Sequence, residues 1–266
     1  MVADQTTPIA EAPMRELSES EFHRYARHLI LDEVGEEGQG RLLEARVLIV
    51  GAGGLGAPVS MYLAAAGVGT LVLVDDDEVD LTNLQRQIVH ATDSVGHAKV
   101  DSAAETLSRI NPGINFETHR KRLTADNAAD LVAGCAVAVD GSDNFETRYL
   151  LNDACLAAGV PLVAGALSRF EGQLTTILPG DGRPCYRCLF PETPDPSLTP
   201  RCEEAGILGA VAGVIGTLQA VETLKLILGL GEPLAGRLML YDALSASMQE
   251  VRYRRRPDCD SCGDHA

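Results

Sequence analysis

Apolar runs of four or five residues alternate with stretches of helical spacing along the first part of this 266-residue chain. The short runs predict buried strands, because a strand covered on both faces is apolar along its whole length. Between them, apolar residues recur every three or four positions, which predicts helices. Strands are expected at 46–50, 70–74, 114–118, 136–139 and 161–164, and helices at 36–44, 56–66, after 99, at 126–131 and at 145–158.

Strands that alternate with helices favour an open parallel sheet with helices on both faces. We therefore predict an α/β class, Rossmann-like fold whose sheet is mostly parallel and wound on both faces. Ser18 and Glu21 form a capping box, which should begin a helix that reaches about Ile30. Residues 1–17 are polar, hold no apolar core of a signal peptide, and are expected to be a disordered tail. Residues 18–266 should form a single domain.

The second part of the chain has a different pattern. Further strands at 172–178, 237–241 and 248–253 predict antiparallel additions to the sheet. Four prolines between 191 and 200 exclude a helix or central strand, so a mobile surface loop is expected there. The apolar run from 206 to 231 carries Gln219, Glu222 and Lys225 at helical spacing. That polar edge favours a buried helix over a membrane span.

A glycine loop follows the first predicted strand. Gly51-x-Gly53-x-x-Gly56 connects that strand to a helix, which is the arrangement that brings backbone against the phosphates of a nucleotide. Asp75 ends the second strand, where an acidic residue accepts hydrogen bonds from ribose hydroxyls. The default interpretation of these features is an NAD site. The other alternative is a tight turn that binds no ligand.

Cationic residues beyond this loop favour ATP over NAD. Arg86 lies shortly after Asp75, and Lys99, one of only three lysines, opens the next predicted helix. An enzyme that expels pyrophosphate from ATP needs cations on the β- and γ-phosphates, whereas hydride transfer has little use for them. Taken singly, Lys99 is equally well explained as a solvated surface charge.

Two carboxylates follow the strand at 136–139. Asp140 and Asp143 stand where the strand ends, and carboxylates in that place can hold Mg²⁺. Asp143 also suits the N-cap of the helix predicted from Phe145. Both interpretations stay open, and one residue can serve both purposes.

The cysteines fall into two classes. Two C-x-x-C pairs, Cys185/Cys188 and Cys259/Cys262, have the spacing of one tetrahedral Zn²⁺ site, with redox pairs or core thiols as the alternative. A site closed by four thiolates is structural and should tie the C-terminal segment to the domain. Cys202 stands alone between the proline-rich stretch and the apolar helix, where a helix N-terminus lowers a thiol pKa. Cys135 and Cys155 lie in apolar contexts that predict buried thiols.

Net charge limits the choice of partner and compartment. A formal charge of −16 argues against nucleic acid as the main partner, because the phosphate backbone repels such a field. Seven cysteines, four of them in metal-type pairs, suit a reducing cytoplasm better than a disulfide framework. The acidity also fits a high-salt or GC-rich source, between which composition does not distinguish.

Together these runs resemble the ThiF/MoeB/HesA family of ubiquitin-activating-type adenylyltransferases. The similarity extends from about Arg24 to Cys262 in the order of the family. The matching runs are Arg24-Tyr-Ala-Arg27-His, Gly51-Ala-Gly-Gly-Leu-Gly56, Asn83-Leu-Gln-Arg-Gln87, Arg109-Ile-Asn-Pro112, Ser142-Asp-Asn144, Glu171-Gly-Gln173 and the two C-x-x-C pairs.

The resemblance implies which residues contact ATP or its Mg²⁺ ion. In addition to the glycines Gly51 and Gly53, these are Gly54, Asp75, Thr82, Asn83, Leu84, Gln85, Arg86, Lys99, Asp143 and Asn144. It also implies a homodimer in which Arg27 reaches the neighbouring subunit's site. Cys202 stands where several relatives carry the cysteine that links covalently to the substrate during sulfur transfer, a step that some close relatives do not need.

The substrate implied by the resemblance is a small ubiquitin-like sulfur-carrier protein that ends in Gly-Gly. Its carboxylate would be adenylated by ATP, and a separate sulfurtransferase or cysteine desulfurase would supply sulfur. The carrier's pathway, such as molybdopterin synthesis, thiamine synthesis or tRNA thiolation, does not follow from the sequence. An NAD-dependent oxidoreductase and a non-catalytic docking module of the same fold remain the alternatives. Intact Arg86, Lys99 and Asp143 count against the docking module.

Overall fold

The computed structural model of the chain describes residues 15–193 and 206–264. Two short helices, α1 (Glu19–Arg24) and α2 (Ala26–Leu29), precede α3 (Gly35–Glu44). The capping box at Ser18 and Glu21 is confirmed. The continuous helix predicted to reach Ile30 is wrong, because the backbone leaves helical geometry at Tyr25. That side chain is 3% exposed, and its hydroxyl accepts a hydrogen bond from Asn111 Nδ2 at 2.8 Å.

The strands of the described residues form one eight-stranded sheet in the order β3-β2-β1-β4-β5-β6-β7-β8. The first five strands of that order pair in parallel, and the last three are added antiparallel. This confirms the predicted α/β class with a Rossmann-like sheet and antiparallel additions. The strands are β1 (Arg46–Val50), β2 (Thr70–Val74), β3 (Asn115–His119), β4 (Val137–Asp140), β5 (Leu162–Ser168), β6 (Glu171–Ile177), β7 (Arg237–Asp242) and β8 (Ser247–Arg252).

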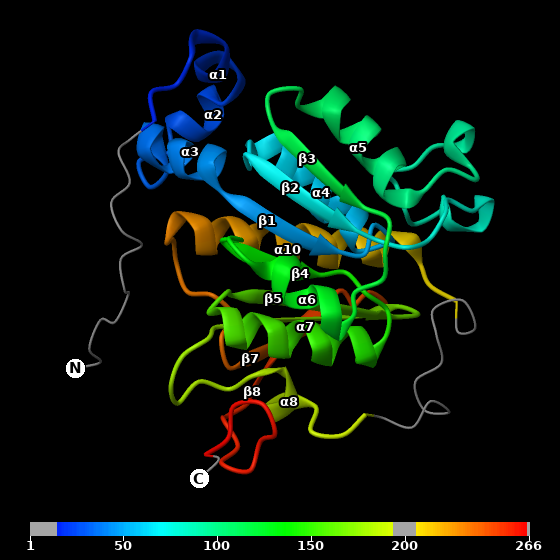
Figure 1. The fold of residues 1–266 in the computed structure, drawn as a ribbon, viewed down its shortest axis with the longest axis vertical. Helices are drawn as coiled ribbons and strands as arrows, with labels where there is room; N and C mark the ends of the chain where they lie inside the picture. Colours follow the sequence, from blue (N-terminus) through cyan, green and yellow to red (C-terminus); the bar gives the residue numbers. More distant parts are fainter. Residues whose placement is uncertain (1–14, 194–205, 265–266) are drawn as a thin grey trace.

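Helices cover both faces of this sheet (Figure 1). One core cluster packs α3 with α4 (Gly56–Ala66), α5 (Lys99–Ile110) and α10 (Gly209–Leu228). The other packs α6 (Ala125–Val132), α7 (Phe145–Ala158) and α8 (Tyr186–Leu189). Within β1, Val47 and Ile49 belong to the first cluster while Leu48 and Val50 belong to the second. The fully apolar strands are explained by this double cover.

The apolar helix α10 is a core helix. By length and composition alone it could cross a membrane, but 56% of its most apolar window is buried inside the fold. It begins at Gly209 rather than at the predicted 206. The side chains of Gln219 and Glu222 face inward: Gln219 donates to Asp140 O at 2.7 Å, and Glu222 accepts from Thr176 Oγ1 at 2.8 Å. The predicted polar edge therefore ties this helix to the sheet.

Short elements escaped the sequence pattern. Two 3-10 turns, η1 (Leu81–Asn83) and η2 (Thr92–Ser94), lie between β2 and α5, and α8 lies between β6 and α10. Each is three or four residues long, too short to establish a hydrophobic period.

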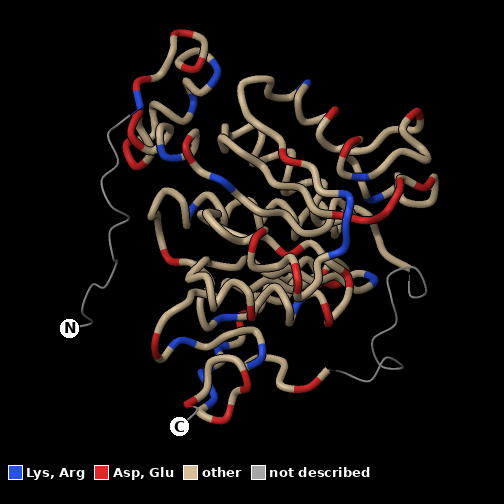
Figure 2. Tube along the Cα trace, viewed as in Figure 1, with Lys and Arg blue, Asp and Glu red and all other residues tan. Residues whose placement is uncertain are grey.

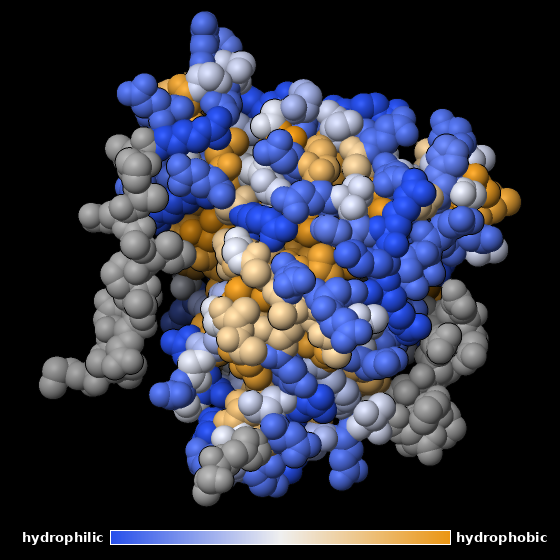
Figure 3. Space-filling model, in the orientation of Figure 1, coloured by the Kyte–Doolittle hydropathy of each residue, from blue (hydrophilic) through white to orange (hydrophobic). Residues whose placement is uncertain are grey.

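Acidic and basic residues are both spread over the fold, and a basic run at 120–122 follows β3 (Figure 2). The viewed face is largely hydrophilic, with hydrophobic residues gathered near its middle (Figure 3).

Candidate functional site

The loops after β1 and β4 meet at the carboxyl edge of the sheet. β1 pairs with β2 on one side and with β4 on the other, so the connections from these strands leave toward opposite faces. Val50 and Asp140 are opposite each other in the register and are the last residues of their strands. A parallel sheet binds ligands at such a reversal, because the diverging loops leave a crevice. The predicted nucleotide-binding residues of the glycine loop follow β1 at this edge, and Asp143 and Asn144 follow β4.

Glycines allow the two loops to approach each other. Gly51 has φ +94°, and a Cβ built there would lie 2.8 Å from Gly141 O. A Cβ on Gly56 would lie 1.8 Å from Gly51 O. Neither contact can be relieved by turning a side chain, since both partners are backbone atoms. Only glycine fits at these positions. The glycines are therefore needed for the packing of the two backbones, in addition to any space that they leave for phosphate.

The peptide of Ala52 is held from both sides. Its N–H donates to Asp75 Oδ2 at 2.7 Å, and its carbonyl accepts from His90 Nε2 at 2.9 Å. Because Nε2 must carry the proton, His90 Nδ1 accepts from Ser102 Oγ on α5, at 2.9 Å. Asp75 is partly buried, and this burial raises its pKa while the nearby Lys99 charge opposes the shift. The glycine loop is thus fixed to β2 and to α5.

His90 is a residue that the sequence reasoning missed. It follows the Asn83–Gln87 run as a buried polar side chain, 7% exposed, and its hydrogen bonds connect the glycine loop to α5, the helix that begins at Lys99. Burial lowers the pKa of His90. A lone histidine after an apolar pair gives no local signal of this role. Only its position beside Ala52 reveals it.

The predicted cations gather at the same edge. Lys99 is buried to 6% exposure and donates from Nζ to Asp77 Oδ2 at 2.7 Å. Arg86 donates from Nη1 to Thr82 O at 3.1 Å, and its Cγ would lie 3.7 Å from a Cβ on Gly54. A buried lysine held against a carboxylate is not a solvated surface charge. The structure thus excludes that alternative for Lys99.

The described residues bring most of the predicted nucleotide set together around this crevice. After β1 come Gly51, Gly53 and Gly54, and after β2 comes Asp75. In and just after η1 are Thr82, Asn83, Leu84, Gln85 and Arg86. Lys99 is the first residue of α5, and β4 is followed by Asp143 and Asn144. Gln87, another buried residue, has Nε2 3.5 Å from a Cβ built on Gly53. Their contacts with a nucleotide stay a prediction.

The loop after β4 separates the roles of its two aspartates. Asp143 is exposed, whereas Asp140 has no exposed surface. The N-cap of α7 is Asn144, whose Oδ1 accepts from Thr147 N at 2.9 Å. The interpretation of Asp143 as a helix cap is therefore wrong, and its carboxylate remains free of that duty. Of the pair, Asp143 is the one whose side chain is open to solvent.

Arg27 lies away from this edge in its own chain. It is exposed on α2, whose neighbours contact the C-terminal ends of α4 and α5: Gln39 Nε2 donates to Ala66 O, and Arg24 Nη1 donates to Ile110 O. Those helices start at the carboxyl edge of the sheet and run back, so α2 sits at the opposite edge (Figure 1). Cys202 and most of the predicted proline-rich loop lie outside the described residues.

The four paired cysteines form one cluster. The Sγ–Sγ distances are 4.0 Å for Cys185–Cys188, 3.5 Å for Cys185–Cys259 and 3.4 Å for Cys188–Cys262. Four sulfurs around Zn²⁺ at its usual bond length lie about 3.8 Å apart, so the cluster fits that ion. Three of the four are buried. The donor set closes on itself and leaves no position for a substrate.

Hydrogen bonds around the cluster tie the C-terminal segment to α7. Ser261 Oγ donates to Asp153 Oδ1, and Arg187 Nη2 donates to Asp153 Oδ2 at 2.9 Å. The backbone N–H of Arg256 donates to Cys188 Sγ at 3.3 Å. Burial raises the pKa of Cys262 to about 11. Zn²⁺ binds the thiolate form of cysteine, so a bound cation would favour loss of the proton from this side chain.

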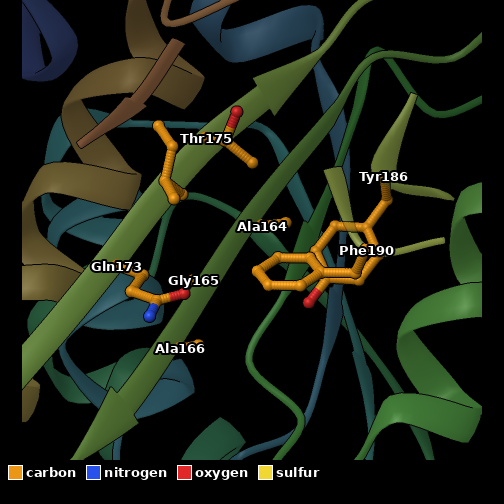
Figure 4. Close-up of a pocket in the computed structure, with 8 residues that line it drawn as sticks. Ala164, Gly165, Ala166, Gln173, Thr175, Tyr186 and Phe190 are labelled. Carbon is orange, nitrogen blue, oxygen red and sulfur yellow. The ribbon is translucent and has the colours of Figure 1, made fainter. Parts of the chain in front are cut away.

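A small space near the cluster cannot hold a substrate. It lies between β5, β6 and the rings of Tyr186 and Phe190, whose centroids are 5.1 Å apart (Figure 4). Its accessible volume is about 10 Å³, which holds at most one water molecule. The candidate active site is therefore the carboxyl edge of the sheet, where the connections after β1 and β4 diverge.

We expect one zinc per chain by elemental analysis of the purified protein. Cys185→Ser should lose that zinc and lower the free energy of unfolding, because the C-terminal segment would lose its tether. Cys155→Ser is the matched control: this thiol is also buried, on α7, but lies outside the cluster. It should keep the zinc. Full zinc occupancy in Cys185→Ser would reject the site.

We also expect His90 to make stability depend on pH. Its folded-state pKa is lowered below the ordinary 6.5 by burial, so on acidification the unfolded chain takes up the proton first. Stability is therefore lost as pH falls through about 6.5. Between pH 7.5 and 5.5, urea unfolding should show a smaller loss for His90→Gln than for the parent. The control is His23→Gln, because His23 is exposed on α1, and this variant should show the same loss as the parent. An equal loss in parent and His90→Gln would contradict the assignment.

Comparison with known proteins gives the family. The model of the ThiF family matches residues 25–261. The SAMP-activating enzyme E1 of Haloferax volcanii is 54% identical over 248 residues, covering 93% of this chain and 91% of that protein. The sulfur carrier protein adenylyltransferase of Thermus thermophilus is 48% identical over 251 residues, covering 93% of each.

Longer relatives and solved structures agree with this placement. The adenylyltransferase and sulfurtransferase MOCS3 of Bos taurus is 50% identical over 262 residues, which are 98% of this chain but 57% of that protein. The crystal structure of E. coli MccB with ATP superposes with a TM-score of 0.79 at 24% identity, covering 92% of this chain and 75% of that one. At that identity the superposition supports the fold alone. On the strength of the family model and of relatives near half identity along almost its whole length, this chain belongs to the ThiF family.

Proposed function

We propose that the protein is an ATP-dependent adenylyltransferase that activates the C-terminal glycine carboxylate of a small ubiquitin-like sulfur-carrier protein. The observation that carries this proposal is the buried Lys99 beside the glycine loop, with Arg86 packed on Gly54. Two cations in this place would suit the β- and γ-phosphates of ATP. The relatives named as a sulfur carrier protein adenylyltransferase and as a SAMP-activating enzyme support the substrate class.

The chemistry follows from charge. The carrier's carboxylate attacks the α-phosphorus of ATP, its oxygen forms the new P–O bond, and the bond to the β-phosphate oxygen breaks to release pyrophosphate. No general base is needed, because the nucleophile is already an anion. The leaving group gathers negative charge, which Lys99 and Arg86 would neutralise. Lys99 exchanges Asp77 for phosphate when the nucleotide binds.

The remaining residues orient the nucleotide. The N–H groups of Gly51 and Ala52 donate to Val74 O and Asp75 Oδ2, so the later N–H groups of the glycine loop, at the start of α4, would face the phosphates. Asp75 would accept hydrogen bonds from the ribose hydroxyls. Asp143 would hold Mg²⁺, which neutralises the phosphates when bound. The zinc cluster contributes structure and no chemical step. The activated carrier then receives sulfur from a separate sulfurtransferase or cysteine desulfurase, in the cytoplasm.

Pyrophosphate exchange tests the proposal. Exchange into ATP should require a small ubiquitin-like protein ending in Gly-Gly from the same organism, and should stop when its last two glycines are deleted. Lys99→Ala and Asp143→Ala should each lower turnover about 10²-fold or more. Lys121→Ala is the matched control, since that lysine is exposed. Exchange that survives deletion of the two glycines would show that the proposed substrate is wrong. Nicotinamide-dependent reduction without pyrophosphate exchange would favour an oxidoreductase.

We further propose a homodimer in which Arg27 serves the neighbouring site. In its own chain Arg27 lies at the opposite edge of the sheet, next to Ile30 and Leu31, which are 70% and 49% exposed. Large apolar side chains at that exposure beside a cation suit an interface. Together with the resemblance, this supports a contribution across the dimer.

Mixed dimers test this arrangement. Arg27→Ala and Asp143→Ala should each be inactive alone, but subunit exchange between them should restore part of the pyrophosphate exchange. One of the two sites in a mixed dimer would combine an intact Arg27 with an intact Asp143. Arg109→Ala, on the exposed side of α5, is a control that should not need complementation. Absence of recovery after confirmed subunit exchange would place Arg27 in its own chain's site or in none.

A further inference from the structure

A buried ion pair lies beneath the loop that carries Asp143. Asp140 ends β4 with no exposed surface, and the side chain of Arg148 on α7 is 9% exposed. Arg148 Nε and Asp140 Oδ2 are 4.0 Å apart, and neither atom has a hydrogen-bond partner within the part of the chain that the structure describes. Desolvating two charges costs more than such a separation returns. Stability alone does not explain the pair.

The pair holds Ser142 by both of its backbone polar groups. Asp140 Oδ1 accepts from Ser142 N at 2.9 Å and from Ser142 Oγ at 2.6 Å, while Arg148 Nη2 donates to Ser142 O at 3.0 Å. On the other side, Asn144 Oδ1 binds Thr147 N. Asp143 lies between these two fixed residues with its carboxylate exposed. Its backbone cannot turn without breaking bonds on one side.

Arg148 is itself immobilised. Its guanidinium carbon lies 5.3 Å from the centre of the Phe145 ring, and its charge interacts with the side chain of Tyr186. Tyr186 follows Cys185, and its N–H donates to Asn152 Oδ1 on α7 at 2.9 Å. Figure 4 shows its ring next to that of Phe190. The guanidinium is therefore held against α8, and its fork geometry is what lysine lacks.

We propose that Asp140 and Arg148 are positioning residues that hold Asp143 in the orientation needed for the phosphate-bound metal ion, an inference that rests on the proposed adenylylation. They do not touch the nucleotide. Asp140 and Arg148 act through Ser142, and their burial lowers stability while it fixes the orientation of the Asp143 carboxylate. The buried atoms Asp140 Oδ2 and Arg148 Nε, which lack hydrogen-bond partners among the described residues, are the evidence for that cost.

Three variants test the proposal in pyrophosphate exchange. Arg148→Lys and Asp140→Asn should lower kcat about 10- to 100-fold, the usual cost of misplacing a catalytic group, with a smaller change in KM for the carrier. Ser142→Ala removes only one bond and serves as the variant that folds if the others do not. Arg46→Lys is the matched control, because Arg46 also pairs with a carboxylate and donates to a backbone carbonyl, Ala133 O, but at the other end of the sheet. It should retain the parent rate.

A double-mutant cycle separates positioning from general destabilisation. In the Asp143→Ala background, Arg148→Lys should cause no further loss, since there is no carboxylate left to orient. Multiplying losses would overturn the proposal. An impaired Asp143→Ala with a fully active Arg148→Lys would do the same while leaving the proposed function intact. If Asp143→Ala keeps the parent rate, the role given to Asp143 in the proposed function is wrong. Asp140 and Arg148 would then have no catalytic carboxylate to position.

Hydrogen exchange supplies a readout without activity or ligand. Amides of the loop from 141 to 144 should exchange faster in Arg148→Lys and in Ser142→Ala than in the parent, while β1 and β2 keep their protection. Arg46→Lys should leave this loop unchanged. Equal exchange in the loop of parent and both loop variants would overturn the proposal.

Discussion

The close approach of two backbones at the carboxyl edge of the sheet is the constraint on which the site depends. Gly141 N donates to Val50 O at 2.8 Å, which extends the pairing of β1 and β4 beyond the strands themselves. A side chain on Gly51 or Gly56 would collide with backbone atoms. Because this contact is made of main chain, it fixes the loop after β1 and the loop after β4 relative to each other. The glycine loop and the Asp143 loop are therefore held in one frame.

Buried polar groups then fix the loops from below. His90 holds the Ala52 carbonyl, Gln219 donates to Asp140 O, and Arg148 holds Ser142 O. Each satisfies a loop carbonyl with a side chain from a neighbouring helix or turn, in place of water. In the proposed reaction, a site prepared in this way would need little reorganisation as charge develops on the phosphates. Preorganisation also explains why several of these groups are charged or titratable in spite of their burial.

The cysteine cluster performs a similar task far from the crevice. After β8 the chain forms no further strand up to residue 264, so the C-terminal segment has little backbone pairing of its own. Four sulfurs and the bonds of Asp153 attach it to α7 and α8. α8 in turn supports Arg148 through Tyr186. Through α7 and α8, the cluster and the Asp143 loop share one supporting layer.

Much of this could be predicted from sequence because its signals are local. The helix at Phe145–Ala158 and the strands at Arg46–Val50 and Thr70–Val74 match their predicted bounds, since each apolar run is buried on both faces. The paired cysteines follow from spacing, and the glycines from the loop they form. The break at Tyr25 and the helix α8 did not follow, because a buried hydroxyl and a four-residue helix depend on distant neighbours.

What the sequence determined by itself was the order of strands and helices, the residue types at the crevice and the thiolate set. Their periodicity and spacing are properties of short segments. Tertiary structure alone decided which polar residues act at a distance. Asp140 and Asp143 look equivalent along the chain, yet α7 places Arg148 against one and leaves the other in solvent. Likewise Arg27 is removed to the far edge, because the direction in which α4 and α5 return across the sheet sets where α2 can dock.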